Sequence, residues 1–198
     1  MSHEEIIGII LAAGESKRFG MPKQLLTFGD TTLLGQVLRN ANTSVLDRVV
    51  AVMGQKADEV RQSVDFGRAI AIDNTAYRTG CASSLLAGLD TAGESDSIML
   101  LLGDQPGVKT EFINQMASTW QKHKPWAAVS SYRGELGHPW VFAREAFEEL
   151  RKLHGDKAVW KLIEAYPERI LRVNIDSMLP LDVDTPADYE RVLSDLGR

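Results

Sequence analysis

The sequence predicts an α/β fold with a mostly parallel sheet, organised as one domain over residues 1–198. Short apolar runs of strand length alternate with segments whose apolar residues recur at helical spacing, and repeated strand–helix units of this kind form parallel sheets. The strongest runs are apolar at every position, which is typical of strands buried on both faces. No Pro- or Ser-rich linker and no fixed-period repeat divides the chain, so we place no internal domain boundary.

Each element follows from its local composition. Strands are predicted at short runs rich in β-branched and apolar residues, and helices where apolar positions recur every three or four residues. The predicted strands cover residues 6–11, 48–53, 69–72, 97–102, 127–131, 140–142 and 170–175, with a glycine-containing loop between the fifth and the sixth. The predicted helices cover residues 32–41, 56–64, 83–89, 110–122, 144–153, 157–165 and 186–196.

Composition narrows the classes of function. Hydrophobic residues make up 44% of the chain and charged residues 25%, as in ordinary globular domains and unlike disordered or fibrous chains. The 22 basic and 27 acidic residues give a net charge of -5, so a bulk basic surface for nucleic acid is absent. Cys81 is the single cysteine, which excludes an intrachain disulfide and a paired-cysteine zinc site. We expect a cytoplasmic protein, because no export signal or membrane-spanning run is visible.

The loop after the first predicted strand is rich in small residues and cations. Sheets of this kind bind ligands beyond the carboxyl ends of their strands, and this loop reads Leu-Ala-Ala-Gly-Glu-Ser-Lys-Arg-Phe-Gly-Met-Pro-Lys over residues 11–23. Small residues let backbone N–H groups approach a ligand, and consecutive exposed N–H groups bind anions. Lys17, Arg18 and Lys23 add three cations, so a polyphosphate is the expected partner. The loop contains neither the Gly-Lys-Ser/Thr nor the Gly-x-Gly-x-x-Gly fingerprint.

The pattern Leu-Ala-Ala-Gly-x-Ser-x-Arg-Phe-Gly-x-Pro-Lys-x-Leu resembles the signature loop of the MobA-like NTP transferase family, and most of all its molybdenum-cofactor cytidylyltransferase branch. The resemblance implies a Rossmann-like, three-layer α/β/α domain of the nucleotide-diphospho-sugar transferase type. It also implies that the loop wraps a nucleoside triphosphate. Arg18 and Lys23 would then neutralise the phosphates and act as catalytic residues.

Two segments are expected to meet the nucleobase. The stretch from Asn74 to Leu85 resembles the family pattern of an Asn, an aromatic residue and Gly-Met-x-Ser-Ser-Leu, with Cys81 in place of Met. The serine pair could instead cap a helix. The nucleotide-binding residues implied by the resemblance are Leu11, Ala12, Ala13, Gly14, Arg18, Lys23, Gly80 and Ser84. Guanylyl members tend to have Gly at the position of Ala13, and the added methyl favours CTP over GTP.

A carboxylate follows the most hydrophobic predicted strand, in Gly-Asp-Gln-Pro over residues 103–106. An Asp in such a turn often caps the chain, but this segment resembles the family's metal-binding Asp-x-Pro element. Magnesium usually takes one or two carboxylates, with water and substrate phosphate oxygens as its other ligands. The resemblance therefore implies Mg²⁺ as cofactor, with Asp104 as a catalytic and metal-binding residue.

A second acidic cluster, Asp-Val-Asp-Thr-Pro-Ala-Asp-Tyr over residues 182–189, resembles a signature near the end of the family's domain. Thr185 and Pro186 suit the N-cap and first position of a helix, and Asp188 suits its first turn. This structural explanation leaves out Asp182 and Asp184, which would share one face of an extended segment. We expect Asp184 to be the second magnesium ligand, with Asp182 as the alternative.

Two further motifs are assigned by resemblance to the acceptor substrate. Gly-His-Pro-x-x-Phe at residues 137–142 gives His138 a role on the acceptor side, although a His beside a Pro is commonly a turn residue. His-Gly-Asp-Lys at residues 154–157 resembles a Gly-Asp-x-Gly motif and gives Asp156 a similar role, with Ala158 where Gly is common. The implied acceptor is a molybdopterin-type phosphate, and a recipient molybdoenzyme or chaperone would take up the product.

The predicted reaction is transfer of CMP from CTP to this acceptor, with release of pyrophosphate. Three alternatives stay open: guanylyl transfer from GTP, cytidylyl transfer to another small phosphate, and nucleotide binding without catalysis. The presence of Arg18, Lys23, Asp104 and Asp184 argues against a silent module.

Overall fold

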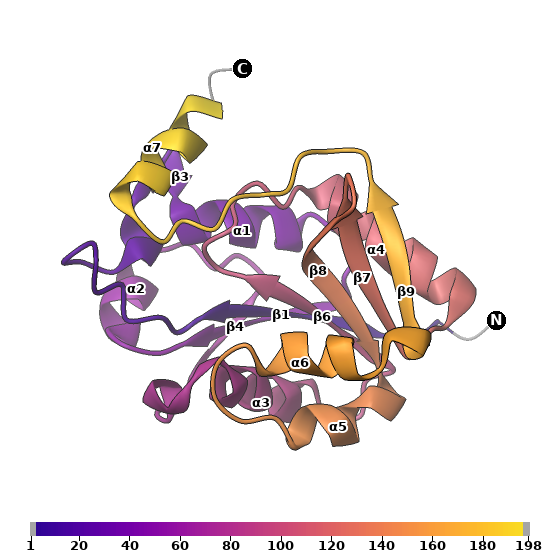
Figure 1. The fold of residues 1–198 in the computed structure, drawn as a ribbon. Coiled ribbons are helices and arrows are strands. Elements are labelled where there is room, and N and C mark those ends of the chain that lie inside the picture. Colours follow the sequence, from indigo (N-terminus) through magenta and orange to yellow (C-terminus); the bar gives the residue numbers. More distant parts are fainter. Residues whose placement is uncertain (1–2, 196–198) are drawn as a thin grey trace.

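The computed structural model describes residues 3–195, which form a sheet between two layers of helices (Figure 1). The sheet has seven strands in the order β5–β4–β1–β6–β8–β7–β9. These strands are β1 (Ile6–Ala12), β4 (Arg48–Met53), β5 (Ile70–Asp73), β6 (Ser97–Leu102), β7 (Ala127–Tyr132), β8 (Glu135–Ala143) and β9 (Ile170–Ile175). The helices are α1 (Leu33–Asn42), α2 (Ala57–Ser63), α3 (Cys81–Ala92), α4 (Thr110–His123), α5 (Phe147–Arg151), α6 (Ala158–Ala165) and α7 (Pro186–Asp195).

The sheet is mostly parallel, as predicted. Strand β1 pairs in parallel with β4 and with β6, β4 pairs in parallel with β5, and β7 pairs in parallel with β9. Strand β8 is antiparallel to both of its neighbours, β6 and β7. The carboxyl ends of β1, β4 and β6 therefore lie next to one another at one edge of the sheet, where the fold class places ligands.

Side chains of each central strand alternate between two cores, as the period of a strand requires. Ile6 and Ile10 of β1 belong to the core covered by α1, α2 and α4, whereas Ile7 and Ile9 belong to the core covered by α3, α5 and α6. Figure 1 shows α1 and α4 on one side of the sheet and α3, α5 and α6 on the other. Within residues 3–195, no helix has the length and apolar character needed to cross a membrane.

Helix α7 lies outside the two main cores. It packs on a small hairpin, β2 (Thr27–Phe28) with β3 (Thr31–Thr32), through a separate cluster that includes Phe28, Val183 and Val192. Thr185 caps the N-terminus of α7, as predicted. The Asp188 N–H donates to Thr185 Oγ1 at 3.2 Å, and the Thr185 N–H donates to the Asp188 carboxylate at 2.9 Å. Both groups would otherwise be orphan donors at the start of the helix.

The predicted strands at 48–53, 97–102 and 170–175 match β4, β6 and β9 at both ends. Two predictions are wrong. The expected helix at 144–153 is a single 3₁₀ turn followed by the five-residue α5. The expected loop before residue 140 belongs to β8, because Arg133 and Gly134, both with positive φ, already reverse the chain. The predicted closing helix ends at Leu196, which lies outside the described residues.

Leu85 tests the packing of α3, the helix whose first residues face the strand ends. Its side chain is fully buried (0% exposed) in the core beneath α3, α5 and α6. We expect Leu85→Ala to lower the free energy of unfolding by about 2–5 kcal/mol, because the truncation leaves a cavity. Urea denaturation measures this change. Val45→Ala is the matched control, since Val45 is 58% exposed; equal effects in the two variants would contradict the packing.

Candidate functional site

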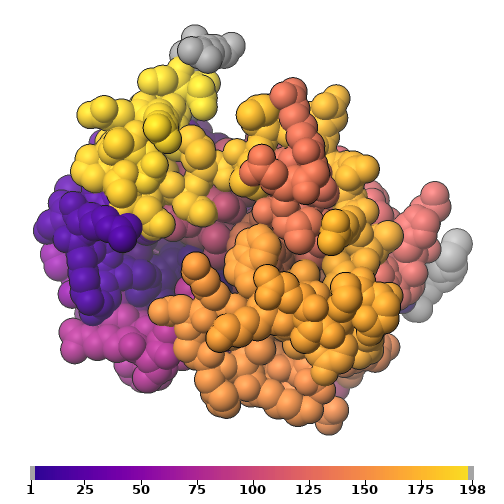
Figure 2. Space-filling model, in the orientation of Figure 1, coloured from indigo at the N-terminus to yellow at the C-terminus, as the bar shows by residue number. Residues whose placement is uncertain are grey.

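A cleft of about 510 Å³ lies at the carboxyl ends of β1 and β6. Figure 2 shows this face hollowed between the indigo N-terminal loop, the yellow C-terminal segment and the orange segment around α6. The residues that line the cleft are Leu11, Ala12, Ala13, Gly14, Glu15, Lys17, Lys23, Gln24, Tyr77, Arg78, Gly80, Cys81, Ser84, Leu102, Gly103, Asp104, Asp156 and Asp184. The cleft therefore brings together most of the residues that the sequence singled out.

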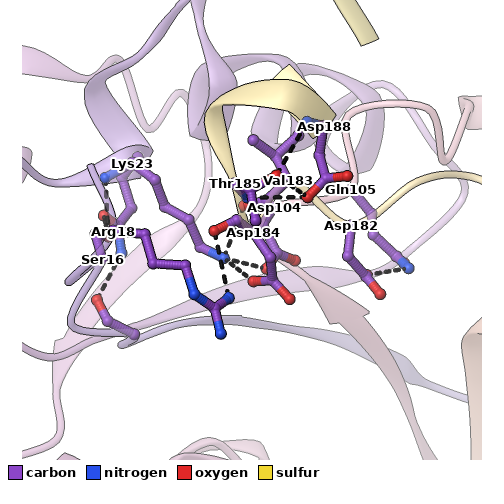
Figure 3. Close-up of polar contacts among 12 residues, drawn as sticks. Ser16, Arg18, Lys23, Asp104, Gln105, Asp182, Val183, Asp184, Thr185 and Asp188 are labelled. Atoms are coloured by element: carbon purple, nitrogen blue, oxygen red, sulfur yellow. Dashed lines mark hydrogen bonds and ion pairs between the residues drawn. The ribbon is translucent and has the colours of Figure 1, made fainter. Parts of the chain in front are cut away.

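Two carboxylates converge on one ammonium at the floor of the cleft (Figure 3). Lys23 Nζ lies 2.6 Å from Asp104 Oδ2 and 2.9 Å from Asp184 Oδ1, and it donates to the Val183 carbonyl at 3.0 Å. The side chains of Lys23 and Asp104 are only 14% and 20% exposed, whereas that of Asp184 is 57% exposed. Lys23 thus has three oxygen partners, which is the full donor capacity of an ammonium group.

The charge of Lys23 is set by two opposing effects. Burial lowers the pKa of the ammonium, but the charges and hydrogen bonds of Asp104 and Asp184 outweigh burial, so the pKa of Lys23 is raised. Lys23 is therefore a cation at neutral pH. Two carboxylates on one cation leave an excess of negative charge at the floor of the cleft.

Asp182 occupies a different position from Asp184. Its Oδ1 accepts a hydrogen bond of 2.7 Å from Gln105 Nε2, and no bond joins it to Lys23. Partial removal of its carboxyl group from water, together with the nearby charge of Asp104, raises the pKa of Asp182 to about 6. The backbone supports the same arrangement, since the Val183 N–H donates to the Asp104 carbonyl at 3.1 Å. Of the two alternatives, Asp184 is the carboxylate that lies with Asp104.

Arg18 lies at the edge of this arrangement. It lines a smaller hollow beside the cleft, shared with Lys23 and Asp184, and its Nη1 lies 3.5 Å from the Asp184 carbonyl oxygen. The side chain is exposed, so it retains the freedom to move towards an anion in the cleft.

The start of α3 and the loop before α6 build the wall of the cleft that faces the signature loop (residues 11–23). Gly80 has φ 115°, and a Cβ there would lie 2.6 Å from the Gly155 carbonyl carbon, so only glycine fits. Asp156 Oδ1 accepts the Cys81 N–H at 2.9 Å and so caps α3. The alternative that Ser83 and Ser84 cap the helix is wrong: Ser83 Oγ and Ser84 Oγ accept from the buried Asn74 amide.

Cys81 lines the same wall but is not poised as a nucleophile. Partial burial of the thiol, together with the nearby charges of Asp156 and Asp104, raises its pKa. A thiol of this kind is mostly protonated at neutral pH, and the thiolate is the reactive form.

His138 does not line the cleft. The residue is 7% exposed, and its ring stacks on Trp140 at a centroid distance of 4.4 Å. Burial lowers the pKa of His138 to about 3, so the ring is neutral at physiological pH. The structure therefore separates the two residues assigned to the acceptor, with Asp156 in the cleft and His138 in the core beside it.

Sequence reasoning missed several residues of the cleft. Gln24 is 3% exposed and lines the cleft from below. Glu15 forms ion pairs with Lys17 at 2.7 Å and Arg78 at 3.3 Å, and these partners lower the pKa of Glu15, with the hydrogen bond from Lys17 as the largest cause. Tyr77 also lines the cleft. The available signal for these three residues was that they lie inside or beside motifs that the sequence analysis recognised.

Solved structures of another protein are similar to this chain over nearly its whole length. Rv0371c from Mycobacterium tuberculosis H37Rv is 36% identical, with a TM-score of 0.90 over 98% of this chain and 100% of that chain. A structure of the same protein in complex with manganese is 34% identical, with a TM-score of 0.85 over 96% of this chain and 98% of that chain.

Two curated relatives are named for different activities, an oxidoreductase and a cytidylyltransferase. The nicotine blue oxidoreductase of Paenarthrobacter nicotinovorans is 29% identical over 140 residues, which are 70% of this chain and 67% of the relative. The molybdenum cofactor cytidylyltransferase of Escherichia coli K12 is 22% identical over 182 residues, which are 91% of this chain and 92% of the relative.

The family comparison covers the strands and the loop that form the cleft. The model of the MobA-like NTP transferase domain matches residues 8–170, from β1 to the first residue of β9. Because this match spans most of the chain, the protein belongs to the MobA-like NTP transferase domain family, a family of nucleotidyltransferases.

Proposed function

We propose that this protein transfers CMP from CTP to a molybdopterin-type phosphorylated acceptor and releases pyrophosphate. The observation that carries the proposal is the cluster of Lys23, Asp104 and Asp184 at the end of the signature loop. Carboxylates and a lysine at one point beside a glycine-containing loop suit a triphosphate with its counter-cation.

The chemistry fits the residues that line the cleft. An oxygen of the acceptor phosphate attacks the α-phosphorus of CTP, and the bond to the β-phosphate oxygen breaks, so pyrophosphate leaves. No side-chain base is needed, because a phosphate monoester with a second pKa of about 6 is already largely ionised. Lys23 and Arg18 would stabilise the negative charge that develops on the leaving pyrophosphate.

The carboxylates fit a divalent cation. Asp104 and Asp184 already converge on a single positive charge, the ammonium of Lys23. Within residues 3–195, no group of three or more His, Cys, Asp or Glu side chains could hold a metal. Mg²⁺ usually takes one or two carboxylates, with water and phosphate oxygens as its other ligands. Asp104 and Asp184 would hold the cation, which would neutralise phosphate oxygens when bound. The relative solved with manganese supports this assignment.

The choice of CTP over GTP rests on Ala12 and Ala13, at the carboxyl end of β1. Ala12 and Ala13 line the cleft and are 5% and 8% exposed, and guanylyl members of the family tend to have Gly at the position of Ala13. The E. coli cytidylyltransferase among the relatives supports the same nucleotide and the same acceptor. The relative named an oxidoreductase supports a different class of reaction, but the loop lacks the Gly-x-Gly-x-x-Gly fingerprint of dinucleotide-binding folds.

One experiment tests the proposed reaction directly. The protein is incubated with molybdopterin, magnesium and either CTP or GTP, and the products are identified by mass spectrometry while pyrophosphate is assayed. We expect a CMP adduct of molybdopterin and an equal amount of pyrophosphate. A GMP adduct would show that GTP, and not CTP, is the nucleotide substrate. Absence of pyrophosphate with every nucleotide and phosphate acceptor would overturn it.

Asp104 is predicted to be essential for turnover. We expect Asp104→Ala to lower the rate of pyrophosphate release by at least about 100-fold, because loss of a metal ligand should cost more than loss of an outer-shell partner. Circular dichroism should show an unchanged fold, since the carboxylate lines the cleft and is not part of either hydrophobic core. Asp176→Ala, an exposed acid on the segment after β9, is the control. Turnover at the wild-type level in saturating magnesium would remove Asp104 from the site.

Lys23 is predicted to bind the triphosphate. We expect Lys23→Met to weaken CTP binding at least about tenfold, because a charged hydrogen bond to phosphate is lost, while Tm changes little. The same variant should bind Mn²⁺ alone more tightly, since Asp104 and Asp184 lose their ammonium partner. Isothermal titration calorimetry measures the first effect and electron paramagnetic resonance the second. Lys109→Met, on a 65% exposed lysine, is the control. Unchanged affinities for CTP would assign the loop another role.

Ala13 is predicted to set part of the preference for the base. A methyl-sized difference in a pocket changes kcat/KM by about 10–200-fold, so we expect a moderate preference for CTP over GTP. Ala13→Gly should reduce that preference, because it removes a methyl without adding a contact. The measurement is kcat/KM for both nucleotides with one acceptor. An unchanged ratio would move selectivity to the segment from Gly80 to Ser84.

A further inference from the structure

A buried amide lies directly beneath the signature loop. The Gln24 side chain is 3% exposed, and its Nε2 donates to the Ala12 carbonyl at 2.6 Å and to the Gly14 carbonyl at 3.4 Å. Burying an amide is costly unless its hydrogen bonds are made. Here the bonds go to two carbonyls of the loop that forms one wall of the cleft.

Ser16 completes a ring of hydrogen bonds with Gln24. Its Oγ donates to Gln24 Oε1 at 3.4 Å and accepts the Lys23 N–H at 2.9 Å, as Figure 3 shows for the second bond. Ser16 has φ 53°, a left-handed conformation that is uncommon for residues other than glycine. The ring therefore ties the two ends of the loop together around a single strained residue.

The direction of these carbonyls fixes the direction of the neighbouring N–H groups. In a trans peptide the C=O of one residue and the N–H of the next point in opposite directions. The Ala12 and Gly14 carbonyls point at Gln24, so the Ala13 and Glu15 N–H groups point away from it. Neither N–H has a hydrogen-bond partner within residues 3–195, and both residues line the cleft.

We propose that Gln24 is a positioning residue that turns the loop carbonyls inward and leaves the Ala13 and Glu15 N–H groups free for the nucleotide. This inference rests on the proposed function, since it takes the cleft as the nucleotide site. Glutamine has the chemistry that the position needs, because its amide donates twice and also accepts. An apolar side chain of equal size would leave the Ala12 carbonyl unpaired, and a carbonyl turned towards the cleft would repel phosphate.

The test compares Gln24→Met with the wild-type protein. Methionine keeps the length of the side chain and adds no charge, so a change in anion binding reports the lost hydrogen bonds. We expect the affinity for magnesium–CTP and for inorganic tripolyphosphate to fall at least about tenfold, with KM for CTP rising more than kcat falls. Gln36→Met on α1 is the matched control, since within residues 3–195 the Gln36 amide bonds to the Asn40 side chain alone.

Backbone NMR separates positioning from stability alone. In the wild-type protein, tripolyphosphate should shift the amide signals of Ala13 and Glu15; in Gln24→Met these two shifts should be lost or much smaller. A variant with a lower Tm but wild-type affinity and wild-type shifts, measured well below its Tm, would overturn the positioning role. If the wild-type protein itself binds neither CTP nor tripolyphosphate, the proposed function fails and Gln24 loses this role with it.

Discussion

The ammonium of Lys23 is the point where three segments distant in the sequence meet. It links the loop after β1 to Asp104 at the end of β6 and to Val183 and Asp184 before α7. Without a cation there, two carboxylates would face each other at the floor of the cleft, and like charges so close disfavour ionisation. The ion pairs that form the site therefore also join the segment before α7 to the sheet, in addition to the small separate cluster in which α7 packs.

The ends of the strands in the parallel part of the sheet were largely predictable from the sequence, and the extent of the antiparallel strand β8 was not. Strands β4 and β6 are apolar at nearly every position, so their composition alone defines their ends. Strand β8 runs through Gly137 and Pro139, which are unfavourable in strands. It forms because both neighbours pair with it, and the register shift between Val129 and Ser130 of β7 accommodates the irregularity. Pairing of this kind is a tertiary effect that local composition does not record.

In the candidate site, too, some residues were predictable from the sequence and others were not. Resemblance to the family's motifs pointed to Lys23, Asp104 and Asp184. Lys23 and Asp104 follow β1 and β6, which are parallel and end at the same edge of the sheet, and Asp184 reaches them from the segment before α7. The role of Gln24 could not be read from its neighbours, since the burial of its amide depends on the path of the whole loop. His138 could not be placed either, because its burial against Trp140 follows from the unexpected length of β8.

The charges of the cleft favour an anion and a cation together over either alone. A triphosphate by itself would approach Asp104 and Asp184 with a single ammonium between them, and a divalent cation by itself would compete with that ammonium. When both bind, Asp104 and Asp184 would hold the cation, and Lys23 would be available to the phosphates. Each ligand would then raise the affinity for the other, as linkage requires. Under the proposed function, one lysine shared between the two subsites is the physical reason why nucleotide and metal would bind as a pair.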